Sequence, residues 1–146
     1  MKAINNIDYY QDSINYILDT QASDGSIPWE QKKKIDPWDH IESAMALTVA
    51  GKFEAAKKAY EWIKFNQEEV GGWYSEYKSG IPSNRRIETN FSAYICVGIW
   101  HFYLVTKDKG FVEYYFPVLD KAMEFVFSMQ THSGEVLWAL SEEGSK

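Results

Sequence analysis

The sequence has little of several features that would place it in a common functional class. Its 146 residues include one cysteine, Cys96, so no disulfide can form within the chain, and a reducing, cytoplasmic compartment is predicted. Lys and Arg number 15 against 21 Asp and Glu, a net charge of −6, which argues against a nucleic-acid partner because such proteins carry basic stripes. The segment from Met1 to Gln11 has neither the apolar core nor the cleavage pattern of a signal peptide.

Several catalytic and membrane signatures are also missing. The sequence contains no phosphate-binding glycine loop, no nucleophile elbow and no cluster with the spacing of metal ligands. His40 and Glu42 form the His-x-Glu pair of zinc deaminases, but the Pro-Cys-x-x-Cys partner is absent, so we predict neither a metal nor another cofactor. The longest apolar stretch, Phe91 to Val105, falls short of the roughly 20 residues of a membrane span and predicts a buried helix instead.

What the sequence does contain is a segment of helical periodicity that occurs three times. In each copy, residues of the apolar stripe stand at offsets 0, 3, 7 and 10, and a glutamine stands at offset 14. A glycine follows four residues later, and a tryptophan follows the glycine. The glycine is expected to end the helix in the left-handed conformation, and the glutamine to hold the loop by hydrogen bonds. The copies comprise Ile7, Tyr10, Ile14, Ile17, Gln21, Gly25 and Trp29; Phe53, Ala56, Tyr60, Ile63, Gln67, Gly71 and Trp73; and Phe116, Leu119, Met123, Val126, Gln130, Gly134 and Trp138.

Two helices of a different kind are predicted between these amphipathic ones. The segment Trp38 to Ala50 is rich in small residues, and Phe91 to Val105 is apolar on nearly every side. The resulting order of about five helices predicts an all-α domain over residues 1–146, built from antiparallel hairpins with outer and inner helices. The connections from outer to inner helix are long and the reverse connections are short, so all long loops should lie on one face.

Two carboxylates are the candidate catalytic residues of that face. Asp39 and Glu88 each precede a Ser-Ala pair by the same spacing, which delivers one carboxylate to the start of each inner helix. Such a pair could act as general acid and general base on a glycosidic bond. The ordinary alternative is that both carboxylates only stabilise the helix starts. Asp36, which precedes Pro37, is predicted to be a turn and cap residue.

Aromatic and polar residues in the same loops are candidates for substrate binding. Flat aromatic rings provide platforms for sugars and other partly apolar ligands. The tryptophans have an alternative role as plugs that close each hairpin, and we expect Trp38 and Trp73 to be the exceptions. The predicted substrate-binding residues are Trp29, Trp38, His40, Trp73, Tyr74 and Asn90.

The helical pattern resembles known toroidal proteins. Thr106-x-Asp108-x-x-Phe111, followed by Phe116-Pro117-x-Leu119-x-x-Ala122-Met123, is similar to a hairpin of the six-hairpin glycosidases, which are (α/α)6 toroids. The run from Gln21 to Trp29 also resembles the glutamine and tryptophan repeats of squalene cyclases and protein prenyltransferases. The resemblance implies part of an (α/α)6 toroid, an incomplete ring. The chain would then be either the N-terminal part of something longer or a half-ring that pairs as a homodimer.

Three alternative functions remain open, and the first two follow from the resemblance. The first is a glycoside hydrolase-like domain that cleaves glycosidic bonds by carboxylate acid–base chemistry, with a sugar as its substrate. The second is a toroid of the prenyltransferase or squalene cyclase type that binds an isoprenoid, although the Asp-x-Asp-Asp acid motif of such cyclases is absent. The third is a helical interaction module without catalytic activity.

Overall fold

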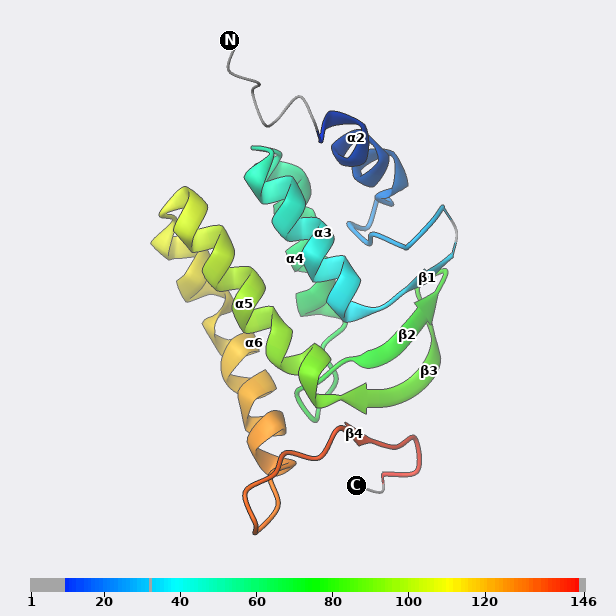
Figure 1. Ribbon diagram of the computed structural model, residues 1–146, viewed down its shortest axis with the longest axis vertical. Helices are drawn as coiled ribbons and strands as arrows, with labels where there is room; N and C mark the ends of the chain where they lie inside the picture. The colour runs from blue at the N-terminus through cyan, green and yellow to red at the C-terminus, as the bar shows by residue number, and fades with distance from the viewer. Residues whose placement is uncertain (1–9, 32, 145–146) are drawn as a thin grey trace, which may run out of the picture.

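The computed structural model describes residues 10–31 and 33–144. Within these ranges the chain forms five helices and a small antiparallel sheet (Figure 1). The first position of the Ile7 stripe lies outside the described residues. The predicted alternation of amphipathic and apolar helices is confirmed. The helices are α2 (Gln11–Thr20), α3 (Pro37–Val49), α4 (Phe53–Phe65), α5 (Thr89–Thr106) and α6 (Lys109–Ser128).

A four-stranded sheet in the order β1-β2-β3-β4 was not predicted from the sequence. The strands lie in the segments that follow the outer helices. β1 (Lys34–Ile35) lies in the loop between α2 and α3, and β2 (Tyr74–Lys78) and β3 (Ile81–Glu88) form a hairpin between α4 and α5. β4 (Ala139–Leu140) follows α6. β1 runs directly into α3 and β3 runs directly into α5, so the sheet lies at the starts of both inner helices (Figure 1). The predicted placement of the long loops on one face is therefore confirmed.

The glutamine and glycine repeat forms the predicted hydrogen bonds in all three copies. The amide nitrogens of Gln21, Gln67 and Gln130 donate to the carbonyl oxygen of the glycine four residues later, at 3.1, 2.8 and 2.9 Å. Those glycines have φ angles of +92°, +102° and +102°, which residues with a side chain rarely adopt. The repeat therefore ends each outer helix in the same way.

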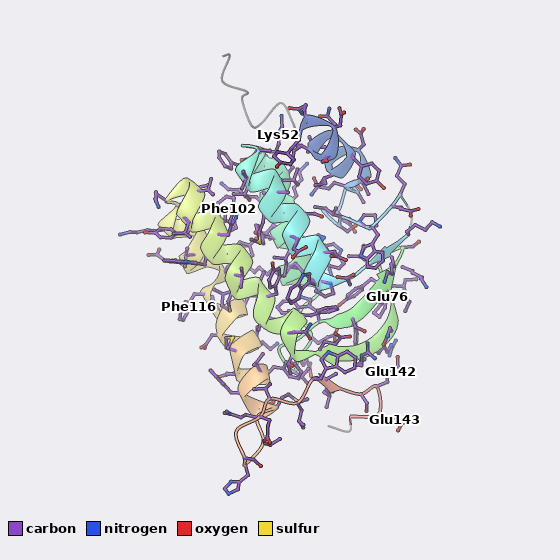
Figure 2. All side chains as sticks on the ribbon, in the orientation of Figure 1. Lys52, Glu76, Phe102, Phe116, Glu142 and Glu143 are labelled. Atoms are coloured by element: carbon purple, nitrogen blue, oxygen red, sulfur yellow. The ribbon has the colours of Figure 1, made fainter. Side chains whose placement is uncertain are left out.

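The predicted burial is wrong for two helices, α6 and α5. Phe116, the first residue of the third stripe, is 61% exposed on the flank of α6 (Figure 2), because α6 begins earlier, at Lys109, and packs a different face through residues such as Phe111 and Tyr115. The α5 helix is not buried on every side, since Val97 and Trp100 are exposed. None of the described helices is long and apolar enough to cross a membrane.

Candidate functional site

A hollow of about 330 Å³ lies where the starts of α3 and α5 meet the sheet. We call it the carboxylate hollow, because four carboxylates from three different parts of the chain line it. Both predicted catalytic residues are among them, so the repeat does bring Asp39 and Glu88 to one site. The lining residues are Trp29, Lys34, Asp36, Trp38, Asp39, Ser75, Glu76, Asn84, Arg86, Glu88 and Phe91.

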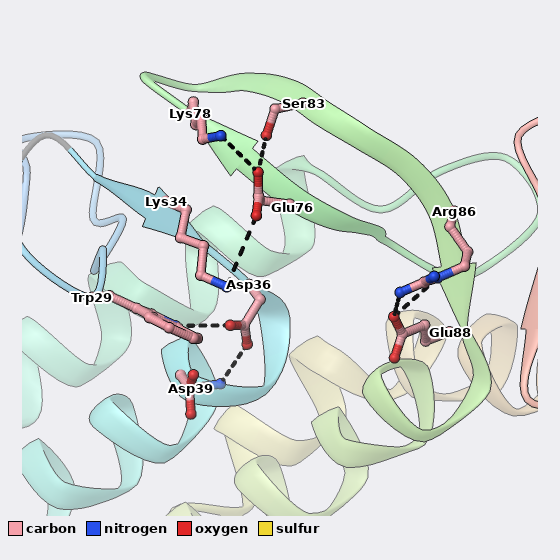
Figure 3. A network of polar contacts seen from close by, with 9 residues as sticks. All are labelled: Trp29, Lys34, Asp36, Asp39, Glu76, Lys78, Ser83, Arg86 and Glu88. Atoms are coloured by element: carbon pink, nitrogen blue, oxygen red, sulfur yellow. Dashed lines mark hydrogen bonds and ion pairs between the residues drawn. The ribbon is translucent and has the colours of Figure 1, made fainter.

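At the start of α3, Asp36 holds the backbone of the first turn. Its Oδ1 accepts a hydrogen bond from the Asp39 backbone N–H at 2.9 Å, which confirms the predicted cap, and Pro37 begins the helix. Its Oδ2 accepts a second hydrogen bond from the Trp29 indole at 2.8 Å (Figure 3). The Lys34 ammonium lies 3.5 Å from the centroid of the Trp29 ring. The cap therefore also fixes an aromatic wall of the hollow.

Asp39, in the same turn, has a carboxyl group with a raised pKa. Burial raises its pKa, and the nearby charge of Asp36, a side-chain hydrogen bond with Asp36 and the charge of Glu42 raise it further, to about 6. A carboxyl group with such a pKa is still partly protonated near neutral pH, as a general acid must be. The surroundings of Asp39 therefore favour proton donation.

At the start of α5, Glu88 has a different set of partners. It is 5% exposed and occupies the cap position of the helix, but its side chain makes no capping hydrogen bond. Its Oε1 instead accepts two hydrogen bonds from the Arg86 guanidinium, at 2.6 and 3.2 Å (Figure 3). Arg86 also lies over the ring of Trp138, 4.5 Å from its centroid. Helix capping therefore does not explain the position of the Glu88 side chain.

The sheet contributes polar groups that sequence reasoning missed. Glu76 on β2 accepts a hydrogen bond from Ser83 and lies within 3.8 Å of Lys34 and 3.1 Å of Lys78 (Figure 3). The Ser75 side chain is buried, lines the hollow, and its hydroxyl has no hydrogen-bond partner among the described residues. A buried hydroxyl without a partner is unfavourable unless water or a ligand completes it. The residues from Tyr74 to Lys78 do not alternate between apolar and polar types, so the local sequence carries no clear signal for this strand.

A second hollow, of about 340 Å³, lies beside the first and shares Trp29 and Asp39 with it. We call it the aromatic hollow, after the rings of Tyr16 and Trp29 that line it. Ile17 of α2 and Ile27 of the following loop line it as well. The Tyr16 hydroxyl donates a hydrogen bond to the Trp29 carbonyl oxygen at 3.3 Å. Asp39 therefore stands between a largely polar hollow and a more apolar one.

The structure brings only some of the predicted binding residues to this site. Trp29 and Trp38 line the carboxylate hollow, and Trp29 is half exposed rather than a plug. Trp73 is fully buried and donates its indole N–H to the Ile63 carbonyl oxygen at 2.6 Å, so it is the plug and not the expected exception. Tyr74 and Asn90 lie outside the lining of both hollows.

The His40 side chain is buried in the core, so it has no exposed surface that a substrate could contact. It is 1% exposed, its Nδ1 accepts from the Ile27 backbone N–H at 3.1 Å, and its Nε2 lies 2.9 Å from the Ala59 carbonyl oxygen. Burial lowers its pKa to about 4. His40 therefore ties the loop after α2 to α4. The described residues include no group of three His, Cys, Asp or Glu side chains that could hold a metal ion.

Comparison with known proteins gives one strong sequence relationship. The MMP endo-(1,4)-3-O-methyl-alpha-D-mannosidase of Mycolicibacterium hassiacum is 42% identical to this chain over 128 residues. The match covers 88% of this chain but 36% of that protein, so the chain spans about a third of the length of this relative. No family model matches the chain.

Three solved structures show where the fold belongs. A sugar epimerase from a ruminal bacterium matches 97% of this chain with a TM-score of 0.70 and 17% identity, over 41% of that protein. Cellobiose 2-epimerase from Bacillus thermoamylovorans matches 99% with a TM-score of 0.68 and 16% identity, over 42% of its length. A family 8 endoglucanase from Klebsiella pneumoniae matches 80% with a TM-score of 0.63 and 12% identity, over 38% of its length. The chain has the fold of part of a six-hairpin (α/α)6 toroid, as the resemblance predicted.

Proposed function

We propose that the carboxylate hollow is part of the active site of a glycoside hydrolase, with Asp39 as general acid and Glu88 as the second carboxylate. The observation that carries this proposal is the meeting of both residues in one hollow with unlike surroundings. Asp39 lies among carboxylates that favour its protonated form, whereas Glu88 is paired with a guanidinium. A glycosidase needs two carboxyl groups with unequal proton affinity.

The proposed reaction is hydrolysis of a glycosidic bond. The bond between the anomeric carbon and the leaving oxygen breaks, and the Asp39 proton moves to that oxygen. Glu88 stabilises the positive charge that develops on the sugar ring. A water molecule then adds its oxygen to the anomeric carbon and loses one proton, and this proton replaces the one that Asp39 gave to the leaving oxygen. The half-exposed face of Trp29 and the ring of Trp38 provide apolar surfaces for the sugar, and the unpartnered Ser75 hydroxyl provides a hydrogen-bonding group.

The sequence relationship suggests the class of substrate. The relative that is 42% identical is named for cleaving (1,4)-linked 3-O-methyl-α-D-mannose, so we propose an oligosaccharide of O-methylated α-linked mannose for this chain. The aromatic hollow beside Asp39 supports this choice, because a methyl ether needs an apolar surface that an unmodified hydroxyl does not. We also keep a reducing, cytoplasmic location as a prediction, on the ground of the single cysteine.

The alternatives have less support at this site. The relatives reported above act by name on sugars, which gives no support to an isoprenoid ligand. The two epimerase structures raise the question of proton transfer at a sugar carbon, but the residues that line the two hollows include no histidine to act as its base. The pair of carboxylates therefore favours hydrolysis over epimerisation.

Two measurements on the full chain test the proposal. Titration with the methylated oligosaccharide should quench tryptophan fluorescence, because Trp29 and Trp38 wall the hollow, and incubation should release shorter sugars. Asp39→Asn and Glu88→Gln should each lower the rate by about 10² to 10⁴, the usual contribution of a positioned acid or base. Binding without any turnover would favour a non-catalytic module.

Glu54→Gln is the matched control. Glu54 is also a carboxylate in the first turn of a helix, α4, but it is exposed and lies outside the hollow. Turnover should be unchanged in this variant. If all three amide variants lower the melting temperature alike and leave turnover intact, the carboxylates only stabilise helix starts and the proposed function is wrong.

A further inference from the structure

A single carboxylate oxygen joins the two inner helices beside the carboxylate hollow. The helices α3 and α5 pack side by side (Figure 1). The Oε1 atom of Glu42, on α3, accepts a hydrogen bond from the Trp38 indole N–H at 2.8 Å and another from the Tyr94 hydroxyl of α5 at 3.1 Å. Glu42 is not among the residues that line the hollow, so it can act on a ligand there only through its neighbours.

The two donors are also stacked on each other. The ring centroids of Trp38 and Tyr94 are 3.9 Å apart, and their planes differ by 10°. Phe91 of α5 lies at a tilt beside the same indole, with its centroid 6.2 Å away. The stacking and the hydrogen bond together fix the plane and the position of the Trp38 ring. Because Tyr94 covers one face of the indole, only the opposite face and the ring edge remain for a ligand in the hollow.

A fixed orientation of Trp38 matters because this residue lines the hollow and is the second residue of α3. A tryptophan without partners in the first turn of a helix could change between side-chain rotamers. A ligand would then have to immobilise the ring when it binds, which lowers its affinity. A ring that Glu42 and Tyr94 already hold loses little freedom when a sugar packs on it.

We propose that Glu42 is a positioning residue for the substrate, because it holds the Trp38 indole against Tyr94 as a rigid wall on which a sugar ring packs. The C–H groups and the methyl ether of an O-methylated sugar suit the flat apolar face of an indole. The inference rests on the proposed function for the identity of this ligand. It adds that affinity depends on a hydrogen-bond acceptor at position 42 and not on the negative charge of Glu42.

Glu61 forms a comparable bridge elsewhere in the fold. This carboxylate of α4 accepts hydrogen bonds from two tyrosines of α6, from Tyr115 at 2.7 Å and from Tyr114 at 3.3 Å. Neither Glu61 nor these tyrosines line the carboxylate hollow or the aromatic hollow. The Glu61 bridge therefore joins two helices by the same chemistry without access to the ligand.

Calorimetric titration of the full chain with an oligosaccharide of (1,4)-linked 3-O-methyl-α-D-mannose tests the proposal. The Asp39→Asn background keeps the sugar from being consumed and removes the effect of Glu42 on the Asp39 pKa. In this background, Glu42→Leu should raise the dissociation constant about three- to tenfold, because the Trp38 side chain must then be ordered on binding. Glu42→Gln should stay within about twofold of the background, because both donors use Oε1 and one amide oxygen can accept both bonds.

Glu61→Leu is the matched control. It should lower the melting temperature about as much as Glu42→Leu and leave the dissociation constant unchanged. Equal weakening of binding by these two variants would overturn the proposal, because the effect would then be one of stability. So would unchanged binding by Glu42→Leu, a Glu42→Gln variant that binds as weakly as Glu42→Leu, or a chain that does not bind the oligosaccharide. The expected binding pattern in a chain whose unsubstituted form never cleaves the sugar would overturn the proposed reaction alone.

Discussion

The starts of α3 and α5 occupy equivalent places in the repeat but have opposite electrostatic surroundings. At α3, Asp36 caps the helix with its side chain, and Asp39 lies near Asp36 and Glu42. At α5, Glu88 occupies the cap position without capping, and its side chain pairs with Arg86. The repeat therefore fixes where each carboxylate stands, while neighbouring strands and loops decide what each carboxylate can do.

In the proposed reaction, this difference is the ground for giving the acid role to Asp39 of α3 and the charge-stabilising role to Glu88 of α5. Arg86 reaches Glu88 because both lie on β3, two residues apart on the same face of the strand. No cation pairs with Asp39 among the described residues, and the nearest charges raise its pKa. Four predictions test whether the two starts really differ in this way.

The largest expected effect is a difference between the Asp39 and Glu88 variants in how their rates depend on the leaving group of the substrate. Asp39→Asn should slow cleavage of an oligosaccharide by about 10² to 10⁴ but leave cleavage of an aryl glycoside with an acidic phenol nearly unchanged, because that leaving group needs no proton. Glu88→Gln should slow both substrates. Steady-state rates on the two substrates measure the difference. If both variants respond alike to the leaving group, the assignment of roles is wrong.

The second prediction concerns the support of α3, which depends on a buried neutral histidine. The folded state lowers the His40 pKa from 6.5 to about 4, so the unfolded chain binds more protons between these values. Stability should fall as the pH drops from about 6.5 to 4, with a contribution from His40 of about 3 kcal/mol. Urea unfolding across this range measures it, and His40→Gln should flatten the slope.

Asp39 provides the control for that experiment because its effect has the opposite sign. Its pKa is raised in the folded state, so protonation of Asp39 favours folding and its contribution is lost as the pH rises through about 6. Asp39→Asn should therefore make the loss of stability on acidification steeper. A pH profile that is equally steep with and without His40 would show that the histidine does not govern this window.

The third prediction concerns the ion pair of α5. Arg86→Met should destabilise the protein by about 2 kcal/mol, because the Glu88 carboxylate would remain buried without its guanidinium partner. The corresponding change near α3, Lys34→Met, removes a partly exposed ion pair of 3.8 Å with Glu76 and should cost less than about 0.5 kcal/mol. Urea unfolding of the two variants gives the comparison. Equal losses would mean that Glu88 is not specially dependent on Arg86.

Local sequence patterns predicted the helices and the meeting of Asp39 with Glu88, because helix periodicity and loop lengths are local properties. The sheet was missed, since β1 and β4 have two residues each and become strands only through pairing with distant residues. The same limit applies to the site. Nothing near Glu88 in the sequence indicates that its side chain pairs with Arg86 instead of capping the helix. Likewise, nothing near His40 or Trp73 indicates that each forms a hydrogen bond with the backbone of α4 inside the core.

Residues contributed by the sheet show the limit most clearly. Ser75 and Glu76 line the hollow because β2 pairs with β1 and β3, and a five-residue strand is a weak signal beside helices of 10 to 20 residues. The prediction for Phe116 was wrong for a related reason. The stripe of α6 was chosen to match the offsets of the other two repeats. In the structure, α6 buries a different face, which is set by the helices and loops that it packs against.

The smallest expected effect concerns the cap that separates the two helix starts. Asp36→Asn keeps one oxygen for the Asp39 backbone N–H but loses the oxygen that accepts from the Trp29 indole, so stability should fall by about 1 kcal/mol. It removes the negative charge beside Asp39, and the pKa of Asp39 should fall from about 6 by up to about one unit. Carbon-13 NMR titration of the Asp39 carboxyl group measures this without a substrate, and the alkaline limb of the rate profile should move by the same amount. An unchanged Asp39 pKa would mean that Asp36 does not raise it, and the contrast between α3 and α5 would then rest on burial, Glu42 and Arg86 rather than on the cap residue.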